Sequence, residues 1–117
     1  MNKYKSIGAL IRHLRNEKKM SLRDLAKKVN MSHVNITHIE NDRVSTNSKS
    51  LIDIAQALDF DSDKILALAN EVNDDIKKII QDRPDAVPKF LRTTKGFNNK
   101  DWKKLEKMVD EIHKGKK

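Results

Sequence analysis

The side chains with the most varied chemistry in this sequence are its four histidines, which could bind a metal ion or transfer protons. They are dispersed along the chain as His13, His33, His38 and His113. The middle pair is five residues apart, whereas a spacing of about four places two ligands on one helix face. Cysteine is absent, and there is no Gly-rich phosphate loop, nucleophile elbow or paired carboxylate motif. We therefore expect no metal, no cofactor and no enzymatic activity.

A second candidate set lies in the segment MSHVNITHIENDR, residues 31–43. If this segment is helical, Ile36 and Ile39 point into a core. At about 100° of rotation per residue, the side chains sent the other way are Val34, Thr37, His38 and Asn41. A solvent-facing surface normally carries Lys and Glu at such positions. Short polar groups, an imidazole and a valine indicate instead a surface that meets another molecule closely.

The composition favours a small helical protein. The chain has 117 residues, of which 37% are hydrophobic and 36% charged, with only three Gly and two Pro. This size fits one domain, or one domain with an appendage. No apolar stretch reaches the length of a membrane span, and the first ten residues lack the apolar run of a signal peptide. We expect a cytoplasmic protein with no membrane association.

The net charge of +8 is unevenly distributed. Residues 1–28 contain nine Lys or Arg against two acidic residues, whereas residues 29–70 contain three basic and six acidic ones. Such asymmetry can place positive charge on one face, where it would attract a polyanion. A lysine-rich solubilising surface explains the same numbers equally well, so charge alone leaves both interpretations open.

Apolar periodicity and cap residues predict five short helices in residues 1–70. The first covers about 6–19, the second begins at Ser21, and the third begins at Ser32 and ends near residue 41. A fourth contains Leu51 and Leu58, and the fifth opens at Ser62. Because each is too short to be stable alone, they must share one core.

Residues 71–117 are predicted to form a separate helical region. One helix carries Ile76, Ile79 and Ile80 and stops before Pro84, and a short segment follows over 85–94. Gly96 interrupts it, and Asn98 caps a longer helix that runs to Gly115.

Two helices joined by a tight turn, the second polar on its outer face, form a helix-turn-helix. The run SLRDLAKKVNMSHVNITHIEND, followed by LIDIAQAL, resembles the Cro/phage-repressor (XRE) family over residues 6–70. The positions that carry this resemblance are Leu25, Ala26, Met31, Ser32, Ile36, Ile39, Glu40, Ile54, Ala55 and Leu58. The resemblance implies an all-α protein: a five-helix repressor-type DNA-binding domain (1–70) followed by a helical C-terminal dimerisation or partner-binding region (71–117).

The resemblance also assigns roles to residues around the third helix, since the major groove of B-DNA admits one α-helix. The expected base-reading residues are His33, Val34, Asn35, Thr37 and His38. The expected phosphate contacts are Ser21, Arg23, Ser32, Asn41, Arg43 and Lys49. The sequence departs from the family at Leu22, where members often carry a Gln that contacts the DNA backbone. It departs again at Asn30 and Asp42, where members tend to have Gly, although both residue types tolerate a positive φ.

Glu40 has a structural interpretation. The resemblance pairs it with a basic residue of the first helix, here Arg15, in an ion pair that would lock the third helix against the first. Removing one partner of such a pair costs a few kcal/mol when it is well buried.

The last helix is the candidate for self-association, because repressors of this type read two-fold operators. Its apolar residues recur every three or four positions, as Trp102, Leu105, Met108, Val109 and Ile112. The alternative is that this helix packs within its own chain.

Three functions remain at this point. The first is a sequence-specific regulator of double-stranded DNA, a repressor acting as a homodimer. The second is an antitoxin, whose C-terminal region binds a toxin while its helix-turn-helix regulates the operon. The third is a protein-interaction module that has lost DNA binding. A protein antirepressor is a further partner to expect.

Overall fold

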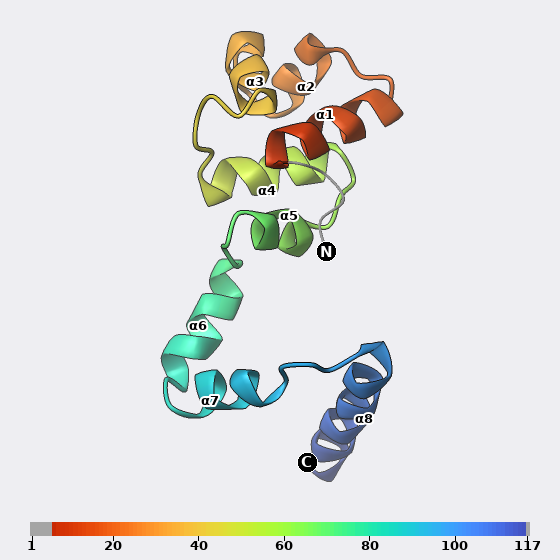
Figure 1. The fold of residues 1–117 in the computed structure, drawn as a ribbon, viewed down its shortest axis with the longest axis vertical. Helices are drawn as coiled ribbons and strands as arrows, with labels where there is room; N and C mark the ends of the chain where they lie inside the picture. Colours follow the sequence, from red (N-terminus) through yellow and green to blue (C-terminus); the bar gives the residue numbers. More distant parts are fainter. Residues whose placement is uncertain (1–5, 117) are drawn as a thin grey trace. The chain divides into compact units, whose positions relative to one another are not determined.

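The protein is described by a computed structural model that covers residues 6–116. Within that range the fold is entirely helical, as the sequence predicts (Figure 1). The eight helices are α1 (Ile7–Glu17), α2 (Leu22–Lys28), α3 (His33–Glu40), α4 (Ser48–Ala57), α5 (Ser62–Leu68), α6 (Asp74–Asp82), α7 (Ala86–Thr93) and α8 (Asn99–Gly115). In this part of the chain, no helix is both long and apolar enough to span a membrane.

Polar side chains define where most of these helices begin. Ser21 and Ser32 cap α2 and α3 by accepting hydrogen bonds from Asp24 N and Asn35 N, each at 3.0 Å. Asn98 caps α8 in the same way, and Asp101 accepts a bond from the Asn98 N–H at 3.1 Å in return. These three predicted caps are confirmed. They could be predicted because an N-cap depends only on residues close to it in sequence.

The turns after the first five helices each contain a left-handed residue other than glycine. Positive φ angles occur among the described residues at Lys19, Asn30, Asp42, Asp59 and Asn70. Asn30 and Asp42 were expected to tolerate a positive φ, and both adopt one, at 55° and 58°. Lys19 was expected inside the first helix, but that helix ends at Glu17 because the backbone turns left-handed two residues later.

One apolar core joins α1 to α5. The buried side chains come from all five helices and are Leu10, Ile11, Leu25, Ala26, Val29, Ile36, Ile39, Leu51, Ile54, Ala55, Leu58, Ile65 and Leu66. The closest packing is between α4 and α5, between α2 and α3, and between α1 and α3. The third helix therefore rests on both of its predecessors, which fixes the side that it presents to solvent.

The contacts divide the chain into two units, residues 1–77 and 78–117. The boundary predicted after residue 70 lies in the loop between α5 and α6, and it stays a prediction. In the second unit, α7 and α8 bury no residue. Its aromatic contact is between Phe97 and Trp102, whose ring centroids lie 5.6 Å apart at an interplanar angle of 71°.

The first turn of α1 lies directly against the end of α3. The Gly8 N–H donates to Asp42 Oδ1 at 3.0 Å, and the Ser6 hydroxyl donates to the other oxygen of the same carboxylate. A Cβ on Gly8 would stand 2.5 Å from the carbonyl oxygens of Ile39 and Glu40. Only a glycine permits this approach, since the atoms in the way are backbone.

We predict that Gly8→Ala destabilises the protein by about 1–3 kcal/mol, the usual cost of overpacking a tight contact. The matched control is Gly115→Ala, because a Cβ at that position has open space around it. Urea unfolding followed by circular dichroism measures both. Equal midpoints for the two variants would contradict the close approach of α1 to α3.

Candidate nucleic-acid interface

The outward side of α3 is set by its buried side. Ile36 is fully buried and Ile39 is 4% exposed, so the side chains opposite them face solvent. Val34 is 51% exposed. His33 and Asn35 beside it are also exposed. The first turn of α3 thus presents an imidazole, a valine and an amide to an approaching molecule.

The second turn of α3 differs from the expectation that Thr37 and His38 face outward, because both are half-buried. The Thr37 hydroxyl donates to the His33 carbonyl at 2.9 Å. The His38 Nδ1 atom is buried and has no hydrogen-bond partner. A helix treated as an isolated cylinder cannot show this, since the burial comes from neighbouring elements. The base-reading roles of these two residues remain predictions.

Glu40 anchors α3 to α1 through the expected pair with Arg15. Its carboxylate, with the side chain only 3% exposed, accepts from Arg15 Nε at 2.6 Å and from Nη2 at 3.0 Å. The remaining Arg15 nitrogen, Nη1, donates to the Met20 carbonyl at 2.8 Å. The hydrogen bond to Glu40 raises the pKa of Arg15 above its ordinary value, although burial opposes the shift. The pair is a structural clamp, as the sequence indicated.

Arg12 is a second partner that the sequence analysis missed. Its Nε atom lies 3.4 Å from Glu40 Oε1, and its Nη2 donates to Asn41 Oδ1. Arg12 and Arg15 are three residues apart and share one face of α1, which is the signal that could have revealed it. Asn41 was expected to bind phosphate. Its side-chain oxygen is occupied by Arg12, so only its NH₂ group is left for that role.

The expected phosphate contacts lie around α2 and the loop after α3. Arg23 and Arg43 are exposed, and so is Lys49, which pairs with Asp53 at 3.2 Å. The Ser21 and Ser32 hydroxyl oxygens accept helix N–H groups, so their O–H groups stay free to donate. The bond from the Ser21 backbone N–H lowers the pKa of Asp24, which keeps this cap ionised.

One surface hollow brings several of these groups together. It lies between α2 and the start of α3, and it is lined by Arg23, Asp24, Ala26, Lys27, Met31, Ser32 and His33. A predicted phosphate-binding arginine, a predicted phosphate-binding serine and a predicted base-reading histidine thus share one site. The other predicted phosphate contacts, Ser21, Asn41, Arg43 and Lys49, do not line this hollow.

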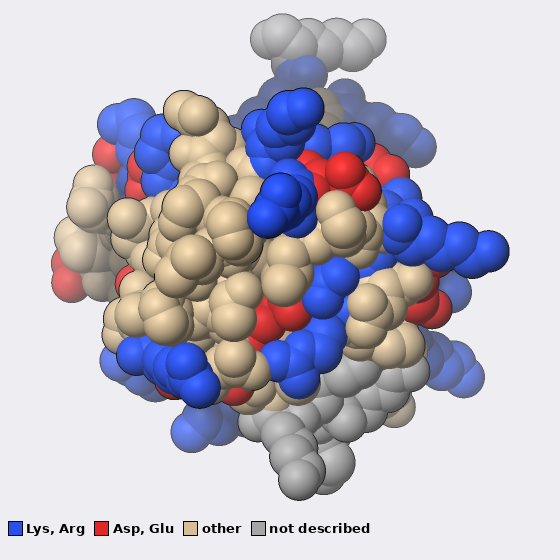
Figure 2. Space-filling model, turned by 90° about the horizontal axis from the view of Figure 1, so that it is seen from above, with Lys and Arg blue, Asp and Glu red and all other residues tan. Residues whose placement is uncertain are grey.

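The charge pattern on this face separates an uncharged area from charged surroundings. Figure 2 looks down on α1, α2 and α3 from the top of Figure 1. A broad area of this face is uncharged, and Lys and Arg side chains lie around it together with some Asp and Glu side chains. Such a surface can place uncharged groups against bases while the border meets phosphates.

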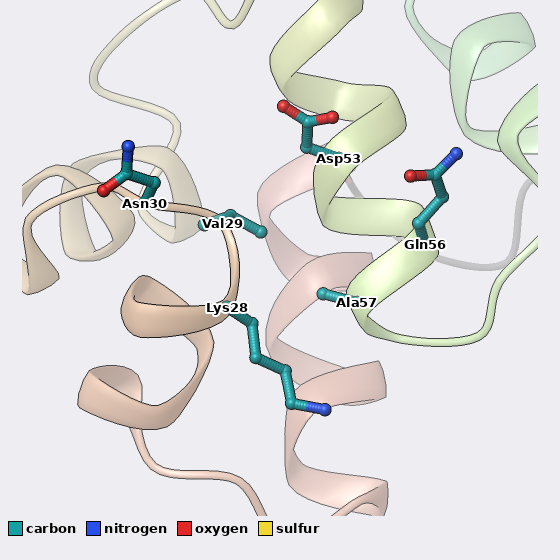
Figure 3. A pocket seen from close by; sticks show the side chains of 6 residues that line it. All are labelled: Lys28, Val29, Asn30, Asp53, Gln56 and Ala57. Carbon is teal, nitrogen blue, oxygen red and sulfur yellow. The ribbon is translucent and has the colours of Figure 1, made fainter.

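A second hollow lies between the end of α2 and α4 (Figure 3). Its lining residues are Lys28, Val29, Asn30, Asp53, Gln56 and Ala57. Asp53 is already paired with Lys49, and Val29 belongs to the core. Within residues 6–116 no group of three His, Cys, Asp or Glu side chains could hold a metal ion. This hollow is a polar-edged junction between packed helices rather than part of the face formed by α3.

Comparisons with known proteins agree with this geometry. Residues 11–65 match the sequence model of a family described as helix-turn-helix. The c2 repressor of phage P22, in complex with a synthetic operator, is 28% identical with a TM-score of 0.50, and the match covers 52% of this chain and 92% of the repressor. The clp gene regulator ClgR from Corynebacterium glutamicum shares the fold at 22% identity and a TM-score of 0.50, covering 76% of this chain and 89% of ClgR. No curated protein matches the chain.

The fold and the exposed α3 define a helix-turn-helix domain of the kind found in DNA-binding transcriptional regulators. The match of residues 11–65 to the helix-turn-helix model and the similarity to the P22 repressor confirm the resemblance seen in the sequence. That class is not enzymatic, which agrees with the expectation that the chain catalyses no reaction.

We predict that Glu40→Gln lowers the free energy of unfolding by roughly 3 kcal/mol, because it leaves the Arg15 charge buried without a partner. The control is Glu71→Gln, which breaks the half-exposed 3.5 Å pair with Lys77. Exposed pairs contribute about 1 kcal/mol or less. Chemical denaturation measures both variants, and a similar small loss in each would show that Glu40 is not the clamp.

Proposed function

We propose that this protein is a sequence-specific regulator of double-stranded DNA, a repressor that acts as a homodimer on a two-fold operator. The observation that carries the proposal is the first turn of α3, where His33, Val34 and Asn35 are all exposed. The similarity to a repressor bound to its operator supports it. A B-DNA major groove admits one α-helix, whose outward side chains then meet base edges.

Base reading in this proposal centres on the first turn of α3. The Val34 methyl groups suit the methyl group of thymine, and His33 and Asn35 can donate to or accept from base edges. Thr37 and His38 lie at the margin of this surface, where the Thr37 methyl and the His38 ring edge can make further contacts.

Phosphate contacts in this proposal come from both sides of α3. Arg23, Ser21 and Ser32 lie on the α2 side, and Arg43, Asn41 and Lys49 lie beyond the end of α3. Leu22, which packs partly against the core, has no hydrogen-bonding group, so it cannot make the DNA-backbone contact of the glutamine that the resemblance implies at this position. Register on the DNA therefore depends on the residues next to it, Ser21 and Arg23.

Dimerisation in this proposal uses the apolar stripe of α8. Met108 and Ile112 are 58% and 61% exposed, Trp102 and Val109 are exposed as well, and Leu105 is half-buried. An apolar stripe of this length left in water is a liability unless a partner covers it. Pairing with its two-fold copy covers the stripe and gives two recognition helices for two half-sites.

The first test is selection of bound fragments from a random pool of duplex DNA by the full chain. A recovered two-fold consensus supports the proposal, because two copies of α3 then read two half-sites. Recovery of no consensus would favour the interaction-module hypothesis instead.

We predict that His33→Ala weakens binding to the selected operator by about 1–3 kcal/mol while leaving non-specific binding nearly unchanged. Arg43→Ala is the comparison variant. It should weaken all duplexes about equally and reduce the salt slope by roughly one unit. Fluorescence anisotropy at several salt concentrations measures both. Unchanged sequence preference in His33→Ala would remove this residue from the reading surface.

We predict that Trp102→Ala combined with Leu105→Ala gives a folded monomer. Its affinity for a half-site should equal that of the parent. Its affinity for a full operator should be much lower than that of the parent, because the parent's tighter binding there comes from the effective concentration of a second, linked domain. The control is Glu106→Gln, an exposed residue outside the stripe. Sedimentation and binding to one or two half-sites provide the measurements.

A parent protein that sediments as a monomer at micromolar concentration would overturn the dimer. The apolar stripe would then be available to bind a different protein, as the antitoxin alternative requires. A small toxin encoded beside this gene would favour that alternative.

A further inference from the structure

The net positive charge of the chain is concentrated in the unit that lacks the helix-turn-helix. Residues 78–117 contain twelve Lys or Arg against six Asp or Glu, a net charge of +6. Residues 1–77 contain thirteen against eleven, a net charge of only +2. A domain that binds DNA through α3 alone gives no reason for the second unit to be the more basic one.

Much of this charge lies on one face of α8. Lys100, Lys103, Lys104 and Lys107 follow the spacing of neighbours on a helix surface, and together they line one shallow hollow. All four are exposed, and none belongs to an ion pair among the described residues. Asp101 also lines this hollow, and its carboxylate accepts from the Asn98 N–H at 3.1 Å, so four lysines stand there against one acidic side chain. Glu111 falls on the same face, one turn beyond Lys107.

This basic face lies opposite the apolar stripe of α8. At about 100° per residue, the centre of the lysine face is roughly half a turn from the centre of the stripe. The stripe can therefore be covered by a partner while the lysines remain in solvent. Helices that are apolar on one side and lysine-rich on the other also lie on anionic membrane surfaces, so the test below includes anionic vesicles.

We infer that the lysine face of α8 is a second DNA contact, which binds phosphates of the duplex backbone without reading sequence. The inference rests on the proposed DNA binding but not on the proposed dimer. The four lysines extend about 10 Å along the helix axis at 1.5 Å per residue. That length matches about three nucleotides of one strand at 3.4 Å each, so two or more lysines can meet phosphates together.

The test compares the full chain with a variant in which all four lysines become glutamine (Lys100→Gln, Lys103→Gln, Lys104→Gln and Lys107→Gln). Glutamine keeps helix propensity and is only one atom shorter than lysine, and circular dichroism checks that α8 survives. The matched control removes the same charge elsewhere, by Lys64→Gln, Lys78→Gln, Lys89→Gln and Lys95→Gln. A third variant changes the four face lysines to arginine, which preserves the charge.

The probes are the selected operator duplex, a random duplex of the same length, and vesicles of phosphatidylcholine with phosphatidylserine. We expect the four-glutamine variant to lower the salt slope on both duplexes by about two to four units, since each lost phosphate contact removes nearly one unit. Between about 50 and 200 mM salt, its affinity should then fall about 16- to 250-fold less than that of the parent. The discrimination between the two duplexes should be unchanged. The control variant should lose less of the slope, and the arginine variant should retain it.

Failure of this inference is distinguishable from failure of the proposed function. If the parent binds the operator selectively and the four-glutamine variant keeps its salt slope, the lysine face does not contact DNA while the proposed function stands. An equal loss of slope in the matched control would show a general effect of net charge and also overturn the inference. The inference is overturned as well if the four lysines govern binding to anionic vesicles and not to DNA. If the parent binds neither duplex, the proposed function itself fails.

Discussion

The orientation of the proposed reading surface depends on one buried ion pair. Glu40 is the last residue of α3, and its carboxylate is held by Arg15 from α1, with Arg12 at its edge. Ile36 and Ile39 decide which side of α3 is buried, but apolar contacts are not directional and allow a helix to slide. A two-pronged hydrogen bond between a guanidinium and a carboxylate is directional. The clamp therefore fixes how far α3 is displaced along its axis, and with it the position of His33, Val34 and Asn35.

Local signals in the sequence predict the helices well, and long-range contacts explain what they miss. The caps at Ser21, Ser32 and Asn98 were predictable because each involves residues three positions apart. The contact of Gly8 with Asp42 joins residues 34 positions apart, and no local sequence pattern predicts it. The half-burial of Thr37 and His38 was missed for a related reason. A helical wheel gives the direction of a side chain but not the width of the neighbour that covers it.

In the proposed complex, the two units present different surfaces to the DNA. The face formed by α3 is uncharged at its centre and suits base edges, where short side chains and correct hydrogen bonding matter. The lysine face of α8 has the charge and the reach for phosphates but no groups that distinguish one base from another. A division of this kind lets the sequence of α3 change its target without loss of general affinity, since most of the positive charge lies elsewhere in the chain.

The position of Trp102 at the start of α8 makes its intrinsic fluorescence a probe of contacts at the apolar stripe. Trp102 is the one tryptophan of the chain, and it lies within the apolar stripe against the edge of Phe97. The first unit contains no indole, so the tryptophan fluorescence of the protein comes from the second unit alone. Because the ring is partly exposed to water, its emission colour changes whenever something covers the stripe. Association through α8 is thus visible without a label, while events confined to the helix-turn-helix leave the signal unchanged.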